Sequence, residues 1–153
     1  MVPSPLPIHQ IVVMRLLDVF LAISRQTGGQ VFTAPFDIVL SDFDVVEPDL
    51  IYFGPDAATR IKLREHVRFR PDLAIEVLSP STARIDRGRK RELLARHGLP
   101  EYWLVDPDAK RLDVFILAGS HYEDARVLQT GRYESPTTPR LSIEIEPLFA
   151  GLD

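Results

Sequence analysis

Three charged residues stand where they could share one site. Glu76 lies inside the apolar run 73–78, a pattern typical of a strand buried on both faces. An ionised carboxylate is costly there unless a cation pairs with it. Asp49 ends a similar strand-like run, and Lys90 falls on the helix predicted to follow Glu76. We therefore predict that Asp49, Glu76 and Lys90 meet in the folded chain.

Two acids and a lysine are the minimal equipment for phosphodiester hydrolysis with a divalent metal. Asp49 and Glu76 are the predicted ligands of Mg²⁺ or Mn²⁺, and the main-chain carbonyl of residue 77 could be another. The metal lowers the pKa of a bound water, and Lys90 positions that water or stabilises the developing charge. A phosphoesterase acting on a nucleotide would use the same carboxylates. Lys90 could equally form an ordinary helix salt bridge with Asp86, worth about 0.3 to 0.5 kcal/mol.

Periodicity predicts a mixed α/β domain with antiparallel strands in its C-terminal half. Helical spacing covers 8–25, between Pro7 and Gly28, and also 84–97. Alternation or apolar runs predict strands at 31–40 with a break at Pro35, 45–53, 72–78, 101–107, 111–117, 121–128 and 141–146. The segment 54–70 is expected to be a mobile loop or a short basic hairpin.

Two placements in the first half of the chain bear on the site. In an unbroken strand at 45–53, Glu47 and Asp49 would share a face, with the two acids side by side. His9 falls in the first turn of the first helix. A lone histidine there is more often a surface residue than a ligand.

Composition excludes several classes of protein. With 153 residues and 45% hydrophobic content, the chain can build one core, so we expect a single domain over 1–153. Zero cysteines exclude disulfides, thiolate catalysis and iron–sulfur clusters. The N-terminal segment lacks the pattern of a secretory signal, and no run of 18 apolar residues occurs. A cytoplasmic protein without a membrane partner is expected.

Charge is unevenly distributed along the chain. The net charge is −4, yet residues 60–96 contain eleven Lys and Arg against five acids, a local charge of +6. A basic segment around a buried acid suits a phosphate-bearing substrate, although basic helices and loops are also common solvated surfaces. Arg87, Arg89 and His9 are predicted to bind that substrate.

Several motifs resemble one known family. VEPDLIYF, PDLAIEVLSPST, the Asp86-x-x-x-Lys90 spacing and GLPEYWLVDP are similar to the Uma-type family of restriction-endonuclease-like proteins, long grouped as a domain of unknown function. HQ at 9 and 10 and APFDIVL before the first acid are similar too. The likeness covers nearly the whole chain.

The resemblance implies a restriction-endonuclease-like fold of the PD-(D/E)XK superfamily, a central mixed sheet flanked by helices. Asp49 matches the first acid of its motif and Glu76 the second. Leu78 stands where that superfamily places its lysine, and Lys90 matches the family's lysine on the following helix. The family's usual N-terminal helix and strand pair are not expected in this chain.

Two functions follow as hypotheses. The first is a metal-dependent endonuclease acting on nucleic acid, for which DNA is the favoured hypothesis. The second is a nuclease-like binding or structural domain without turnover, which the acidic overall charge and Leu78 favour. A homodimer is expected because late strands would present open edges.

Overall fold

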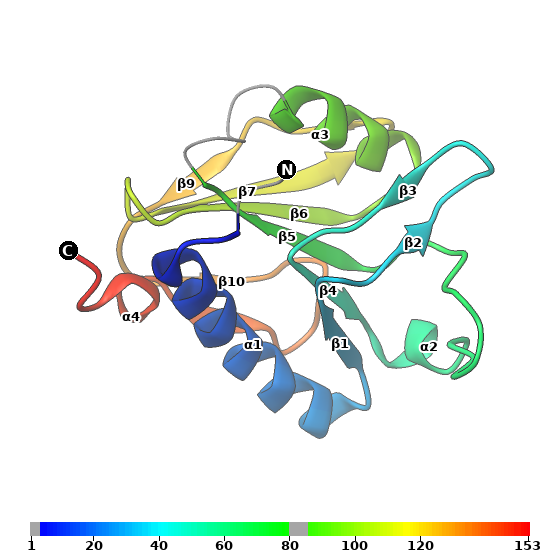
Figure 1. Cartoon of the computed structure of the whole chain (residues 1–153), viewed down its shortest axis with the longest axis horizontal. Helices are drawn as coiled ribbons and strands as arrows, with labels where there is room; N and C mark the ends of the chain where they lie inside the picture. Colours follow the sequence, from blue (N-terminus) through cyan, green and yellow to red (C-terminus); the bar gives the residue numbers. More distant parts are fainter. Residues whose placement is uncertain (1–3, 80–85) are drawn as a thin grey trace.

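A central mixed sheet organises the molecule (Figure 1). The computed structural model describes residues 4–79 and 86–153, with Asp86 and Arg87 described by their backbone only. The strand order is β1-β4-β5-β6-β7-β8, and β9 also pairs with β7. The strands are β1 (Gln30–Thr33), β4 (Leu50–Phe53), β5 (Leu73–Val77), β6 (Glu101–Asp106), β7 (Arg111–Ala118), β8 (His121–Tyr122) and β9 (Arg126–Leu128). The pair β5–β6 is parallel and the other pairs are antiparallel, as the predicted mixed sheet requires.

Helices and short hairpins cover both faces of this sheet. Parallel strands need a crossover, and α3 (Asp86–Arg96) provides it between β5 and β6 on one face. The two-stranded sheet β2 (Ile38–Val39) and β3 (Val45–Val46) lies on the same side. The other face is covered by α1 (Pro7–Thr27), the hairpin β10 (Arg132–Glu134) to β11 (Ser142–Glu144), and α4 (Glu146–Phe149). The short α2 (Pro55–Ala58) follows β4.

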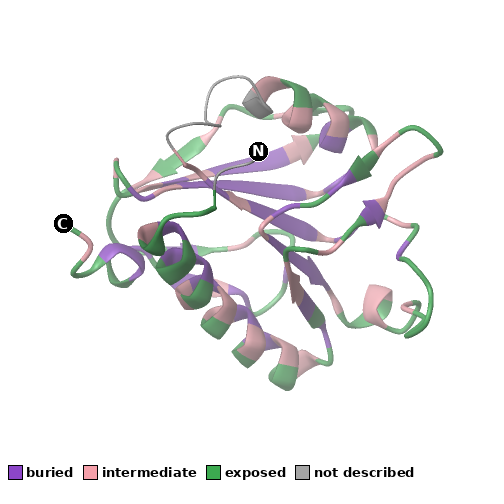
Figure 2. Cartoon of the chain, in the orientation of Figure 1, coloured by how far each residue is buried: buried purple, intermediate pink, exposed green. Residues whose placement is uncertain are grey.

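Each face of the sheet has its own hydrophobic core. The α1 core includes Val12, Leu16, Phe20, Tyr52, Leu73, Ile75, Val77 and Trp103. The α3 core includes Ile38, Phe53, Ala74, Leu94, Leu99, Tyr102, Leu104 and Phe115. Figure 2 shows the central strands buried, with the exposed residues on the outer surfaces of the covering layers. Successive residues of a central strand therefore enter different cores, so the face on which a polar residue lies decides its surroundings.

The first helix agrees with its sequence signals. Pro7 lies in its first turn, where the missing N–H has no helical partner to lose. Gly28 ends it with a φ of 87°, a left-handed conformation that glycine adopts without strain. By length and composition α1 could cross a membrane. Core helices of soluble proteins pass the same test, and Val12, Leu16 and Phe20 of α1 pack in the core.

The predicted strand 45–53 is broken into β3 and β4, and one expectation fails with it. The segment Glu47-Pro48-Asp49 lies between these strands, because Pro48 has no N–H to continue a ladder. Glu47 is exposed, and a hydrogen bond with Asp37 raises the pKa of its carboxyl. Glu47 and Asp49 therefore do not form a side-by-side pair on a strand.

Three other segments differ from their predicted form. Residues 54–70 contain α2 and then a loop, whose Val67 forms an isolated bridge with Ile38, so the hairpin alternative is wrong. The predicted strand 121–128 is split into β8 and β9. The predicted loop before β11 contains β10, since pairing across a hairpin depends on contacts that local propensity does not encode.

Candidate active site

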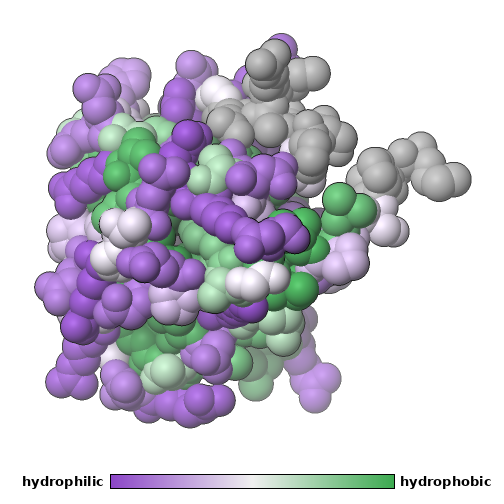
Figure 3. Space-filling view, turned by 90° about the vertical axis from the view of Figure 1, so that its left-hand side faces the viewer, coloured by the Kyte–Doolittle hydropathy of each residue, from purple (hydrophilic) through white to green (hydrophobic). Residues whose placement is uncertain are grey.

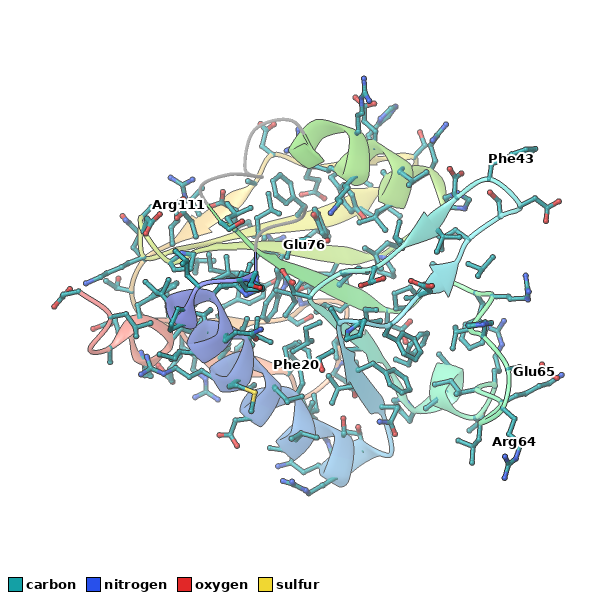
Figure 4. All side chains as sticks on the ribbon, viewed as in Figure 1. Phe20, Phe43, Arg64, Glu65, Glu76 and Arg111 are labelled. Carbon is teal, nitrogen blue, oxygen red and sulfur yellow. The ribbon has the colours of Figure 1, made fainter. Side chains whose placement is uncertain are left out.

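Strand alternation places Glu76 beneath α3. Leu73, Ile75 and Val77 of β5 enter the α1 core, so Glu76 points to the opposite face. Figure 4 shows Glu76 near the middle of the sheet, away from the molecular edge. Its side chain is 16% exposed, which leaves the carboxyl mostly desolvated but open on one side.

Asp49 reaches the same position from the neighbouring strand. Leu50 pairs with Ile75, so Asp49 lies one residue before β4, beside the end of β5. Its Oδ2 accepts a hydrogen bond from the Val77 N–H at 2.8 Å. Asp49 also lies close enough to Glu76 for its carboxyl to raise the pKa of the Glu76 carboxyl. The predicted meeting of these two acids is therefore present in the structure, and a backbone donor fixes one of them.

Burial and charge strongly perturb Glu76. Burial raises the pKa of its carboxyl to about 7, the Lys90 ammonium opposes this shift, and the Asp49 carboxylate adds to it. The physical cause is that two acids share one desolvated position with a single lysine nearby. Such an arrangement is typical of a site that binds another cation.

Lys90 completes the group from above the sheet. It lies in the first half of α3, and its Nζ is 3.5 Å from Glu76 Oε1. The side chain is 43% exposed, so the ammonium can contact solvent or a ligand as well as the acid. The lysine that the strand lacks at Leu78 is thus supplied by the following helix. Its alternative partner Asp86 has a side chain outside the described residues.

The three predicted substrate-binding residues have different positions. His9 is only 9% exposed, and its Nε2 is 3.3 Å from Asp49 Oδ2, so the expectation of a surface histidine is wrong. The first turn of α1 packs against the site, which explains this burial. Arg89 is exposed on α3, beside Lys90 in sequence. The Arg87 side chain lies outside the described residues.

Donor chemistry at this site fits a hard divalent cation. Asp49 and Glu76 present carboxylate oxygens, and Mg²⁺ is commonly held by one or two carboxylates together with waters and substrate phosphates. The N–H and C=O of one strand residue point to the same side, so the Val77 carbonyl is directed toward Asp49 as its N–H is. Among the described residues no cluster of three or more His, Asp and Glu side chains meets metal-binding geometry. Asp49 and Glu76 are the side chains that could hold such a cation.

One further residue belongs to the surroundings of the acids and was not identified from the sequence. Tyr102 of β6 is buried on the same face of the sheet as Glu76, and burial together with the Glu76 charge raises the pKa of its phenol well above the ordinary value. His9, which contacts Asp49, was predicted from the sequence as a substrate-binding residue, and the HQ pair was its signal. Tyr102 gave none, because aromatic residues in apolar strands are usual.

A large apolar groove lies elsewhere and does not contain these acids. It has a volume of about 880 Å³ and is lined by Ile11, Met14 and Val19 of α1 and by Ile143 and Leu148, among others. Figure 3, which views the molecule from the left side of Figure 1, shows hydrophobic patches interrupted by hydrophilic side chains. Asp49, Glu76 and Lys90 thus lie outside this groove.

Fold and site together define a restriction-endonuclease-like protein with a pair of acids and a lysine at the end of a central strand. The family model Uma2, described as "Putative restriction endonuclease", matches residues 1–146. The chain belongs to this family.

A solved structure agrees with this assignment. The chain is similar to the crystal structure of "a putative nuclease belonging to DUF820" from Anabaena variabilis, with a TM-score of 0.78 and 21% identity over 96% of this chain and 83% of that chain. At this identity the likeness establishes the shared fold. A comparison with curated proteins found no match. The family and the fold support a nuclease and confirm the predicted restriction-endonuclease-like architecture.

Proposed function

We propose that the protein is a metal-dependent endonuclease that hydrolyses phosphodiester bonds of DNA. The observation that carries this proposal is the largely buried Glu76 carboxyl, which has the Asp49 carboxyl close beside it and the Lys90 ammonium 3.5 Å away. A buried pair of acids is costly without a compensating cation. A bound Mg²⁺ or Mn²⁺ would supply that charge and lower the pKa of a coordinated water.

The chain's own groups have separate roles in this mechanism. Asp49 and Glu76 would hold the metal, with Asp49 fixed in position by the Val77 N–H and His9. Lys90 donates a hydrogen bond toward the attacking water or the scissile phosphate, where negative charge develops. The buried Tyr102 excludes water from the sheet face beside Glu76 and so strengthens these charge interactions.

A cleavage assay tests the proposal. Supercoiled plasmid and duplex oligonucleotides are incubated with the protein in Mg²⁺, in Mn²⁺ and in EDTA. We expect cleavage only with metal, loss of cleavage in Glu76→Gln, and full activity in the matched control Glu123→Gln, whose carboxyl is exposed. Absence of cleavage in every metal, or equal cleavage by Glu76→Gln, would refute the proposal.

A nuclease-like domain without turnover is the second candidate. Leu78 at the superfamily's lysine position favours it. Calorimetry separates the two, because the catalytic proposal requires Mn²⁺ uptake that is lost in Asp49→Ala. Absence of uptake in the unaltered protein favours the inactive domain.

We also propose a homodimer as the functional form. The sheet ends at β1 on one side and at β8 and β9 on the other, and Val127 of β9 is 59% exposed. Open edges of this kind favour strand pairing between copies. Light scattering during size-exclusion chromatography measures the oligomeric state, and a monomer at all concentrations would contradict the proposed homodimer.

A further inference from the structure

The loop after α2 concentrates positive charge in one exposed segment. Residues 60–70 contain five Lys and Arg and one acid, a local charge of +4 in a chain of net charge −4. All six charged side chains are exposed. Figure 4 shows Arg64 and Glu65 extending into solvent at the edge of the molecule, away from Glu76. We call this segment the basic loop.

Part of this charge is already engaged within the loop. Lys62 pairs with Glu65 at 3.6 Å, and Arg70 pairs with Asp72 at 3.4 Å. The Arg60 guanidinium lies 4.1 Å above the Phe69 ring. The contacts of Arg60 and Arg70 hold the two ends of the loop, whereas the Lys62–Glu65 pair is highly exposed.

The middle of the loop is different. In the part of the chain that the structure describes, Arg64 and Arg68 have neither an ion pair nor a hydrogen bond from the side chain. Leu63 beside Arg64 is 98% exposed. An exposed cation without a protein partner is free to contact an external anion at little desolvation cost, and here two such cations are presented on a loop fixed at its ends.

The basic loop is connected to the catalytic acids through α3. Lys90 contacts Glu76 in the first half of this helix. Gly98, just after the end of the helix, lies beside the Arg70 side chain, since a Cβ placed on Gly98 would be 3.6 Å from Arg70 Nε. Eight residues of helix span about 12 Å. Arg96 is exposed on α3 between these points, as is Glu92, and Arg89 is exposed just before Lys90. Cations therefore extend from the site to the basic loop over a distance of several nucleotides.

We propose that the basic loop is a docking site for the phosphate backbone of the nucleic acid, outside the catalytic centre, with Arg64 and Arg68 as its contacts. The cations are spaced along an exposed loop, which suits a line of phosphates better than one small anion. The inference rests on nucleic acid being the ligand of the proposed function. It adds the place at which the part of the nucleic acid distant from the scissile bond binds. It requires a nucleic acid long enough to reach the basic loop.

Binding without turnover tests the inference. Fluorescence anisotropy in EDTA measures the affinity for a duplex of about 24 bp and for a hairpin with a stem of about 6 bp, over a range of NaCl concentrations. The variant is Arg64→Ala with Arg68→Ala. The control is Arg25→Ala with Arg126→Ala, which removes the same charge from exposed positions on α1 and β9.

We expect the loop variant to bind the long duplex at least about 10-fold more weakly at low salt, with the log–log salt slope reduced by about 2. Its affinity for the short hairpin and the behaviour of the control are expected to be unchanged. Equal affinity of loop variant and control for the long duplex would overturn the inference, as would absence of binding by the unaltered protein. If binding follows the expectation but no metal gives cleavage, the docking site stands and the proposed nuclease activity fails.

Discussion

Two acidic residues on neighbouring strands, Glu76 of β5 and Glu101 of β6, have opposite surroundings. Glu76 interrupts the apolar run of β5 and Glu101 begins the apolar run of β6, and the two strands are parallel partners. Glu76 faces α3 near the end of its strand, whereas Glu101 faces the α1 core at the start of its own. The two acids therefore differ in the groups that the fold brings to their carboxyls.

Glu101 is fully buried and completely satisfied by neutral donors. Its Oε2 accepts hydrogen bonds from Trp103 Nε1 at 2.6 Å and from Tyr133 Oη at 3.0 Å. Its Oε1 accepts from the hydroxyls of Ser135 and Thr137, each at 2.7 Å. These donors tie the segment around β10 to the central sheet. All four bonds remain within the protein, so the carboxyl has no capacity left for a ligand.

Glu76 has fewer partners and a less favourable neighbour. Among the residues that the structure describes, its carboxyl has the Lys90 ammonium at 3.5 Å and the second acid, Asp49, close by. Burial without enough donors raises its pKa, and one side stays open to solvent. A buried acid that has few hydrogen-bond donors and remains accessible to solvent says more about function than an acid whose hydrogen bonds are all internal.

The largest expected effect distinguishes the two acids by activity. We expect Glu76→Gln to reduce metal-dependent cleavage at least about 10³-fold, roughly 4 kcal/mol in activation free energy, because a metal ligand is lost. The variant should remain folded, since an amide is less costly than a carboxylate in that position. Initial cleavage rates and a thermal melt measure both quantities. An active variant, or one that fails to fold, would remove the contrast with Glu101.

The complementary change tests stability. We expect Glu101→Ala to lower the free energy of unfolding by about 4 kcal/mol, because the buried donors of Trp103 and Tyr133 and two less buried hydroxyls lose their acceptor. Urea denaturation measures it, with the exposed Glu134→Ala on β10 as the control. Cleavage per folded molecule should change by less than about twofold, because Glu101 lies on the face opposite the site. A stable Glu101→Ala protein would mean that the network is not needed for the fold.

The pH dependence of stability isolates the burial of Glu76. In the folded protein its pKa is about 7 against an ordinary 4.5, so the folded state holds this proton more tightly than the unfolded chain. Stability is therefore greatest below about pH 4.5 as far as this group is concerned, and it decreases as pH rises toward 7, by up to about 3 kcal/mol.

Urea denaturation in EDTA between about pH 5 and pH 8 measures this term as the difference between the unaltered protein and Glu76→Gln. We expect the unaltered protein to lose stability relative to the variant as pH increases, and Mn²⁺ to restore it at high pH. A difference that is constant with pH would contradict the assignment of the shift to Glu76.

Lys90 gives the smallest of these effects. We expect Lys90→Ala to reduce cleavage about 30-fold, roughly 2 kcal/mol, with Mn²⁺ binding retained because the carboxylates remain. The lysine opposes protonation of Glu76, so the pH at which activity appears should increase in the variant. Lys110→Ala, on the β6–β7 turn, is the control. Unchanged rates would assign Lys90 to packing alone.

Much of the fold could be predicted because its signals are local. Helical spacing between Pro7 and Gly28 gave α1, and apolar runs gave β5 and β6 with their turns. The break at Glu47-Pro48-Asp49 and the β10–β11 pairing could not be placed correctly, since both depend on which distant strand is available for pairing. The family motifs indicated the architecture independently.

The sequence by itself determined which residues could do chemistry, Asp49, Glu76 and Lys90, because an acid within an apolar run demands an explanation at any position in the fold. It did not distinguish Glu76 from Glu101, which also stands among apolar residues. Only the tertiary structure decided that Glu101 is surrounded by four donors while Glu76 meets Asp49 and one lysine, and that His9 lies against Asp49. The physical reason is that the cost of a buried charge depends on partners brought from distant parts of the chain.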